Sequence, residues 1–188
     1  RIRLLKTVLS QANGHDYILI DCPPALGLLT VNALVAADAV LVPLQAEFYA
    51  LEGLSQLLMT VREVRQAANP DLRLDGVVLT MYDGRNNLSQ QVEADARATL
   101  GELVYDTVIP RNVRISEAPS YGKPVLVYDL KCVGSDAYLR LATEIIQRER
   151  NRPMSLGDAL TWPENDHGRL LVNAKSGRAA VQVPAPSL

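Results

Sequence analysis

Short apolar runs alternate with amphipathic stretches along the first 150 residues of this chain. Apolar runs of strand length lie at residues 17–20, 39–43 and 77–80, with shorter candidates at 107–109 and 125–127. Apolar residues at helical spacing predict helices at residues 2–9, 26–37, 51–68, 88–100 and 135–150. Strands that alternate with helices predict a mainly parallel sheet with helices on both faces, so the expected fold class is α/β, doubly wound.

The character of the sequence changes after Arg150. The remaining residues include four prolines and the single tryptophan, Trp162, and show no helical periodicity. Runs 170–172 and 179–181 are candidate strands, but the prolines and the lack of an evident partner argue against a second domain. We therefore predict one ordered domain over residues 1–150 and a weakly ordered Pro/Gly-containing extension over residues 151–188.

Composition narrows the class of protein. The chain is 48% hydrophobic and 21% charged, which is typical of a soluble globular protein, and no apolar run approaches membrane-spanning length. A net charge of −2 excludes a globally basic DNA-coating protein but leaves room for a local basic patch. Cys22 and Cys132 form no CxxC pair, which fits a reducing cytosol. The non-methionine start at Arg1, with no signal peptide, suggests a fragment.

An acidic residue, Asp21, directly follows the first apolar run. Ligands collect at the carboxyl ends of parallel strands, so this carboxylate is expected to point into a binding site. An acid in this position is also common in α/β proteins as a cap for the following turn. Position alone leaves both interpretations open.

Four segments resemble the ParA/Soj family of DNA-partitioning ATPases. Residues 16–24 (DYILIDCPP) resemble the Walker B strand and switch II start of ParA/Soj and MinD proteins. Residues 43–53 (PLQAEFYALEG), which are also explained by packing at a helix start, resemble the segment after the next strand. Residues 79–85 (LTMYDGR) and 109–124 (IPRNVRISEAPSYGKP) follow in the family's order. The resemblance covers residues 1–150 and implies a P-loop NTPase-like fold of the deviant Walker A class, incomplete at its amino-terminal end.

The resemblance implies a nucleotide site. The residue matching Asp21 binds magnesium through water, a role that suits a carboxylate. The adenine-contacting residues that it implies are Thr80, Met81, Pro110, Arg111 and Asn112. A plain surface loop is the alternative interpretation of residues 110–112.

The resemblance also implies contacts with DNA. Arg85 and Arg114 match arginines that contact DNA phosphates without recognising sequence in the ATP-bound dimer. Taken alone, two arginines in polar loops are more often solvated surface charge or members of local ion pairs.

The segment that would hold the phosphates is missing from this sequence. Phosphoryl transfer needs a Gly-rich loop ending in Gly-Lys-Thr or Gly-Lys-Ser, and neither occurs here. Gly122-Lys123-Pro124 has proline in place of the hydroxyl residue, so we predict a turn there. In the family the loop and the first strand precede the helix that begins this chain. We therefore expect a gap beside the strand that ends at Asp21, poor solubility, and no catalytic residue that can be assigned within the chain.

The implied function is chromosome or plasmid partitioning. Intact family members bind ATP and Mg²⁺, form a homodimer, bind DNA non-specifically, and hydrolyse ATP when a ParB-type activator stimulates them. They are cytoplasmic and nucleoid-associated, without membrane attachment. We expect the truncated chain to be unable to hydrolyse ATP alone. Alternatives are a non-catalytic DNA- or partner-binding paralogue and, ranked lower, a MinD-like cell-division ATPase, whose basic amphipathic terminal helix this chain lacks.

Overall fold

The computed structural model describes residues 3–12, 14–23, 25–47, 49–151, 159–161, 171–173 and 179–182. The helices are α1 (Leu4–Leu9), α2 (Leu28–Ala36), α3 (Ala50–Ala67), α4 (Asn87–Leu100), α5 (Val113–Glu117), α6 (Val125–Tyr128) and α7 (Val133–Asn151), with short 3-10 turns η1 (Gly101–Leu103) and η2 (Ala118–Tyr121). The strands are β1 (Ile18–Asp21), β2 (Ala39–Gln45), β3 (Arg73–Thr80), β4 (Ala159–Thr161), β5 (Leu171–Asn173) and β6 (Ala179–Gln182). No helix in the described ranges is both long and apolar enough to cross a membrane.

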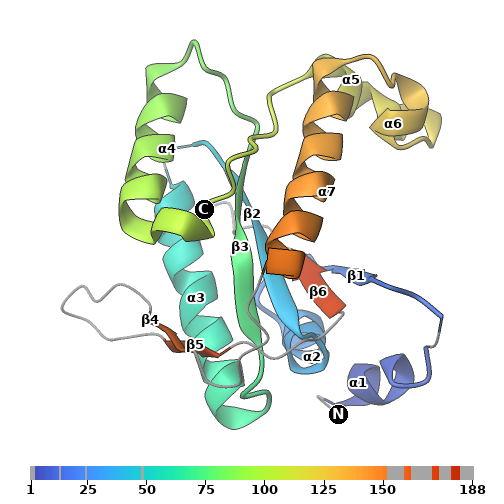
Figure 1. The fold of residues 1–188 in the computed structure, drawn as a ribbon, viewed down its shortest axis with the longest axis vertical. Coiled ribbons are helices and arrows are strands. Elements are labelled where there is room, and N and C mark those ends of the chain that lie inside the picture. The colour runs from blue at the N-terminus through green and yellow to red at the C-terminus, as the bar shows by residue number, and fades with distance from the viewer. Residues whose placement is uncertain are drawn as a thin grey trace.

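The main sheet has four parallel strands in the order β1-β6-β2-β3 (Figure 1). Strands β2 and β3 pair along the whole of β2, from Ala39 opposite Arg73 to Gln45 opposite Thr80. Strands β4 and β5 form a separate antiparallel pair. Because the four strands of the main sheet are parallel, their carboxyl ends meet at one edge.

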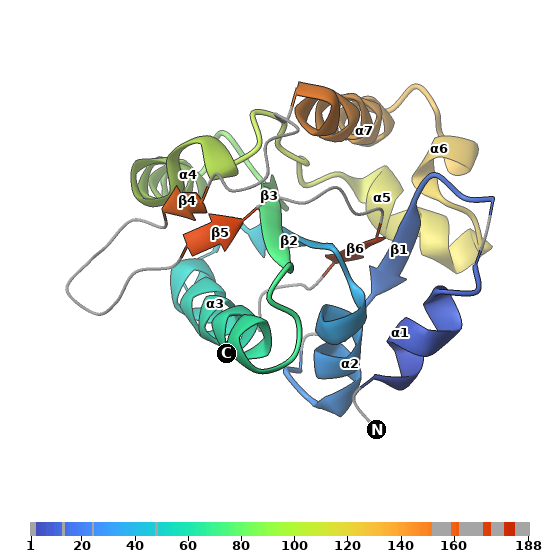
Figure 2. The ribbon, with the colours of Figure 1, turned by 60° about the horizontal axis from the view of Figure 1, so that its bottom comes forward.

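Helices cover both faces of this sheet (Figure 2). Successive side chains of β3 point to opposite faces, and its buried residues divide accordingly. Val77 and Leu79 belong to a large cluster with α2, α3 and α4, whereas Val78 packs in a second cluster with α7. The predicted doubly wound α/β fold is therefore confirmed.

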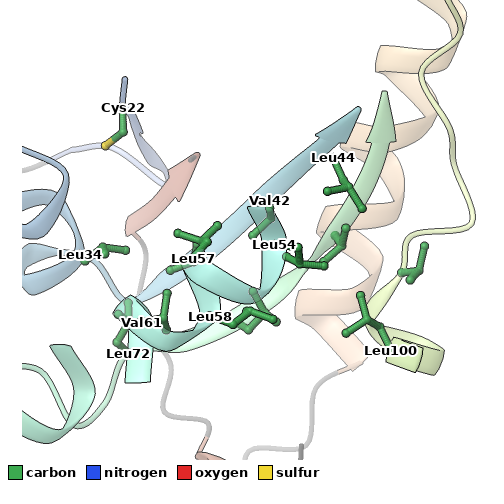
Figure 3. Packing of buried hydrophobic residues seen from close by; sticks show 14 of the residues in the cluster. Cys22, Leu34, Val42, Leu44, Leu54, Leu57, Leu58, Val61, Leu72 and Leu100 are labelled. Atoms are coloured by element: carbon green, nitrogen blue, oxygen red, sulfur yellow. The ribbon is translucent and has the colours of Figure 1, made fainter. Parts of the chain in front are cut away.

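The amphipathic pattern of α3 explains how it binds the sheet. Its buried face carries Leu54, Leu57, Leu58 and Val61, at the spacing of one helix side, and it packs against Val42 and its neighbours on β2 (Figure 3). Burial of each such side chain stabilises the fold by about 1.5–3 kcal/mol. This layer holds the carboxyl end of β2 in place.

A glycine permits the close approach of Tyr105 to β3. A Cβ atom on Gly76 would lie 2.5 Å from Cε2 of Tyr105 and 2.8 Å from the carbonyl oxygen of Leu103. The hydroxyl of this fully buried tyrosine donates to Asp75 Oδ2 at 2.7 Å, and the Arg148 guanidinium lies 4.0 Å from the ring centroid. These contacts join α7 to the sheet.

Two of the short strand predictions are wrong. Residues 125–127 form helix α6, whose first turn is closed by bonds from the amides of Val127 and Tyr128 to the carbonyl oxygen of Pro124. Residues 107–109 form no strand, although the amide of Ile109 donates to the carbonyl oxygen of Leu79 at 2.8 Å. The following residue, Pro110, has no N–H to continue such a ladder.

The candidate strands in the tail do have partners, which corrects the expectation from sequence. Strand β5 pairs with β4, and β6 lies between β1 and β2. The gap expected beside β1 is therefore filled by the backbone of β6. The four prolines and Trp162 of the tail lie outside the described residues, and the division at residue 150 stays a prediction.

Candidate functional site

The carboxyl edge of the sheet brings together the loops that follow Asp21, Gln45 and Thr80. Asp21 is exposed, while the adjacent Cys22 is buried in the core, where burial, followed by the charge of Asp21, raises the pKa of the thiol. The buried cysteine anchors the chain directly after the aspartate. Pro24, the last residue of the Walker B-like motif, lies outside the described residues.

Asp21 is suited to only part of a magnesium site. No group of three or more His, Cys, Asp or Glu side chains gathers around a possible metal position in the described part of the chain. Mg²⁺ keeps several waters and binds proteins through one or two carboxylates together with substrate phosphates. One exposed carboxylate at a strand end fits that kind of site, provided that phosphates supply further ligands.

Backbone hydrogen bonds place the two predicted adenine-contacting segments side by side. The amide of Tyr82 donates to the carbonyl oxygen of Ile109 at 3.1 Å, and the amide of Arg111 donates to the carbonyl oxygen of Tyr82 at 2.9 Å. Thr80 and Met81 thus lie beside Pro110 and its neighbours. Residues far apart in the sequence form one surface at the carboxyl edge.

Met81 has an unusual backbone conformation in this surface. Its φ is 53°, and among the described residues no other non-glycine residue has a positive φ. The left-handed region costs an ordinary side chain about 1–2 kcal/mol. Such outliers persist where the surrounding structure imposes them, often at functional sites. Here the next residue, Tyr82, is hydrogen-bonded to Ile109 through its amide.

The loop after β2 is tied to the same surface. The amide of Ala46 donates to the carbonyl oxygen of Thr80 at 3.0 Å, and the hydroxyl of Ser89 donates to the carbonyl oxygen of Ala46 at 3.3 Å. Glu47 and Arg111 form an exposed ion pair at 3.8 Å. These contacts join the loop after β2 to the end of β3 and to α4. Phe48, one of the two aromatic residues in this motif, lies outside the described residues.

Asn112 has a structural role that the sequence analysis did not predict. Its side-chain oxygen accepts a hydrogen bond from the amide of Arg114 at 2.9 Å and caps the start of α5. An asparagine directly before the helix was the available signal.

Arg85 is paired with an acid in its own loop. Its Nε lies 3.0 Å from Oδ1 of Asp83, and its Nη2 lies 3.1 Å from Oδ2. Hydrogen bonds from the Arg85 side chain and amide hold the pKa of Asp83 below its usual value. The Arg85 side chain is 92% exposed, so it remains accessible despite this pair.

Arg114 is held by two carboxylates. Its Nη1 lies 2.9 Å from Glu117 and its Nε lies 3.4 Å from Asp129, while the side chain is 52% exposed. The Tyr128 hydroxyl also donates to Glu117, at 3.3 Å. The sequence analysis gave local ion pairs as an alternative for this arginine but did not name the acidic partners. The spacing of Arg114 and Glu117 along a helix was a usable signal, whereas Asp129 comes close only through the fold.

The segment Gly122-Lys123-Pro124 forms a turn, as predicted. Gly122 adopts a φ of 63° and ends η2, with its amide donating to the carbonyl oxygen of Pro119 at 3.0 Å. The amide of Lys123 donates to the carbonyl oxygen of Ala118. These amides are used locally and do not form a phosphate cradle.

An open cavity of about 990 Å³ lies at the opposite end of the sheet. Its lining includes Leu74, at the start of β3, together with Gly101 and Arg148. The polar groups of Arg148 already bind Glu144 and the carbonyl oxygens of Glu102 and Val104. This cavity is therefore distinct from the candidate site.

Comparison with known sequences gives several matches. A family model described as an AAA domain matches residues 1–74. The chromosome partitioning protein ParA of Caulobacter vibrioides is 67% identical over 143 residues, which cover 76% of this chain and 54% of ParA. The sporulation initiation inhibitor protein Soj of Bacillus subtilis is 54% identical over 144 residues, covering 77% of this chain and 57% of Soj. The chain thus spans about half the length of these curated relatives.

Solved structures share the fold. Cobyrinic acid a,c-diamide synthase from Mycobacterium smegmatis, with bound ADP and magnesium, has a TM-score of 0.65 and 36% identity, covering 81% of this chain and 55% of that protein. The cell division ATPase MinD of Pyrococcus furiosus has a TM-score of 0.63 and 26% identity, covering 78% of this chain and 59% of MinD.

Proposed function

This chain is a homologue of the ParA/Soj family of chromosome-partitioning proteins, and from that premise we propose that it works in DNA partitioning as an ATP-dependent switch. In the proposed cycle, ATP and Mg²⁺ support a homodimer that binds DNA without sequence preference. A ParB-type activator then stimulates hydrolysis and release. The proposed location is the cytoplasm, on the nucleoid.

The observation that carries this proposal is the backbone pairing of residues 79–82 with residues 109–111. This pairing supports a binding site for a flat purine. The proposed lining of the site is Thr80, Met81, Pro110, Arg111 and the backbone of Asn112. Asp21 ends a strand of the same sheet and is proposed to bind magnesium through water. Similarity to a protein solved with ADP and magnesium supports the choice of ligand.

The phosphates require a further segment. These 188 residues contain no Gly-Lys-Thr or Gly-Lys-Ser, and the amides around Gly122 are used in a turn. Catalysis of phosphoryl transfer depends almost entirely on positioning and charge stabilisation, and a phosphate-binding loop with its lysine is one of the parts that provide them. We therefore propose that these 188 residues alone do not hydrolyse ATP, and no catalytic residue is assigned within them.

The proposed DNA contacts are made by Arg85 and Arg114. Both side chains are exposed, and guanidinium groups suit phosphate oxygens. Each arginine is held by carboxylates, so binding DNA requires Asp83, Glu117 and Asp129 to give up or share their partners. The proposed contacts are consequently weakened by salt and independent of base sequence.

The proposal is tested by comparing the 188-residue chain with a version to which a phosphate-binding loop and its strand have been added in front. We expect ATP turnover and ATP-dependent DNA binding only in the extended version. Asp21→Ala should abolish the Mg²⁺-dependent turnover, while Asp95→Ala, a matched loss of a carboxylate on α4, should not. Turnover by the short chain would contradict the proposal.

A second candidate is a non-catalytic DNA-binding module. The exposure of Arg85 and the absence of a phosphate-loop motif from these residues favour it. In that case the 188-residue chain should bind DNA without nucleotide, with an affinity that falls steeply with salt and falls further in Arg85→Ala and Arg114→Ala. Absence of nucleotide-free binding would eliminate this candidate.

The MinD-like alternative has weaker support. The MinD structure shares 26% identity with this chain, whereas the ParA relative shares 67%. A MinD-like protein would sediment with anionic lipid vesicles in the presence of ATP. We expect the extended version to stay in the supernatant.

A further inference from the structure

Strand β6 occupies a central position in the sheet although it comes from the carboxyl-terminal end of the chain. It pairs in parallel with β1, from Ile18 opposite Ala179 to Asp21 opposite Gln182. On its other side it pairs in parallel with β2, from Ala39 opposite Ala180 to Leu41 opposite Gln182. Two strands that are neighbours in the sequence are thus joined through a third one (Figure 1).

The position between β1 and β2 requires an extended backbone. Val40 and Val42 of β2 are fully buried, so the backbone N–H and C=O groups of the same strand lie next to the core. Buried backbone N–H and C=O groups that lack partners are strongly destabilising. In the described part of the chain, β1 and β2 each obtain partners on these edges from β6.

The pairing of β6 with its two neighbours is short in the described part of the chain. Strand β2 has seven residues, and all of them pair with β3, while its pairing with the described residues of β6 runs from Ala39 to Leu41. Strand β6 itself is only four residues long. The described contacts of β6 are thus main-chain pairs with four residues of β1 and three residues of β2.

We propose that the space between β1 and β2 is a strand-binding site and that residues 179–182 occupy it as a displaceable strand of the same chain. Main-chain hydrogen bonds provide the binding, as in other cases where an extended segment is added to a sheet. The site takes segments in parallel orientation, in the register in which Ala180 lies opposite Leu19. This inference does not depend on nucleotide or DNA binding.

A designed disulfide tests the register. Leu19→Cys and Ala180→Cys, in a Cys22→Ala and Cys132→Ala background, place thiols on residues that are opposite each other. Paired strands lie about 4.8 Å apart, within the Cα separation of roughly 4.4–6.8 Å that a disulfide spans. We expect an intramolecular cross-link in the monomer. A control pair, Leu19→Cys with Gln91→Cys on α4, should not cross-link. A cross-link formed only between chains, or none, would overturn the proposal.

A proline substitution tests the hydrogen bonding without added thiols. Ala180→Pro removes an N–H group from a strand that is paired on both sides. We expect amide exchange in residues 18–21 and 39–41 to become at least about tenfold faster, because these edges lose their partner. Ser187→Pro, an equal substitution outside the paired residues, should leave exchange unchanged. Equal exchange in the two variants would contradict the proposal.

Displacement is tested with a synthetic peptide that has the sequence of residues 176–185. The tethered strand competes at an effective concentration on the order of 1 mM, so peptide at several times that concentration should lower the cross-linked fraction at least about twofold. A peptide with the same composition in scrambled order is the control. A cross-linked fraction that neither peptide changes would show that the strand is not displaceable.

Discussion

The backbone amide of Arg111 donates to the carbonyl oxygen of Tyr82 at 2.9 Å, and this bond joins two loops at the carboxyl edge of the sheet. The amide of Tyr82 in turn donates to Ile109, so the two loops are held by their main chains. Side-chain substitutions at Thr80, Met81 or Arg111 should therefore change binding while leaving the arrangement of the loops intact.

Substitutions at Met81 should reveal the cost of its positive φ. Met81→Val is expected to lower the free energy of unfolding by about 1–2 kcal/mol, because β-branched residues are strongly disfavoured in the left-handed region. Met81→Gly should change it by less than about 1 kcal/mol, since glycine adopts this conformation without strain. Urea denaturation followed by circular dichroism measures both. Equal losses of unfolding free energy in the two variants would show that stability depends on the Met81 side chain and not on its backbone conformation.

Neutralising Asp83 should strengthen the proposed DNA contact. Asp83→Asn removes the carboxylate that binds Arg85, so in the extended, ATP-bound version we expect DNA affinity to rise about two- to fivefold at low salt. Asp95→Asn on α4 makes the same change in net charge, and its side chain binds Gln91 rather than an arginine. Fluorescence anisotropy with labelled duplex DNA measures the effect. Equal gains in both variants would indicate a general charge effect.

Gly76→Ala should disturb the packing of Tyr105 on β3. The new Cβ would lie 2.5 Å from the ring and 2.8 Å from a backbone carbonyl oxygen. Overpacking of this kind costs about 1–3 kcal/mol of unfolding free energy. Gly84→Ala, where the nearest atom is at 3.5 Å, is the control and should change stability by less than about 0.5 kcal/mol. A stable Gly76→Ala protein would contradict this account of the interface.

Glu144 should make stability depend on pH. Its carboxylate accepts bonds at 2.9 Å from the amides of Asp106 and Thr107 and pairs with Arg148 at 2.8 Å. Burial alone raises the pKa of Glu144, but hydrogen bonds from Thr107 and Asp106 and the charge of Arg148 outweigh burial and leave the pKa below its usual value. Its contribution is therefore present above the unfolded-state pKa and is lost as the pH falls through the folded-state pKa.

Glu144→Gln is expected to lower the free energy of unfolding by about 1–2 kcal/mol at pH 7. The difference from the wild type should shrink as the pH falls below the ordinary glutamate pKa of about 4.3 and then through the lower folded-state pKa. Glu63→Gln on the exposed face of α3 is the control, with an effect below about 0.5 kcal/mol. Urea titrations at several pH values measure both. A difference that stays constant with pH would contradict this role for the charge.

The sequence predicted well where the signal is local. Apolar runs ending at Asp21 and Thr80 predicted strands, and the spacing of Leu54, Leu57 and Val61 predicted α3, because burial on one side imposes a period on the chain. The same reasoning gave a wrong prediction for residues 125–127. Their β-branched character favours a strand, but the carbonyl oxygen of Pro124 starts a helical turn instead.

The sequence by itself determined the layered α/β fold, the position of Asp21 at a strand end, and the turn at Gly122. Each depends on short-range periodicity or on the backbone preferences of one or two residues. Only the tertiary structure decided that residues 79–82 pair with residues 109–111, and that β6 lies between β1 and β2. These pairings are made by backbone groups that are alike in every residue, so side-chain patterns give little information about which distant segments meet.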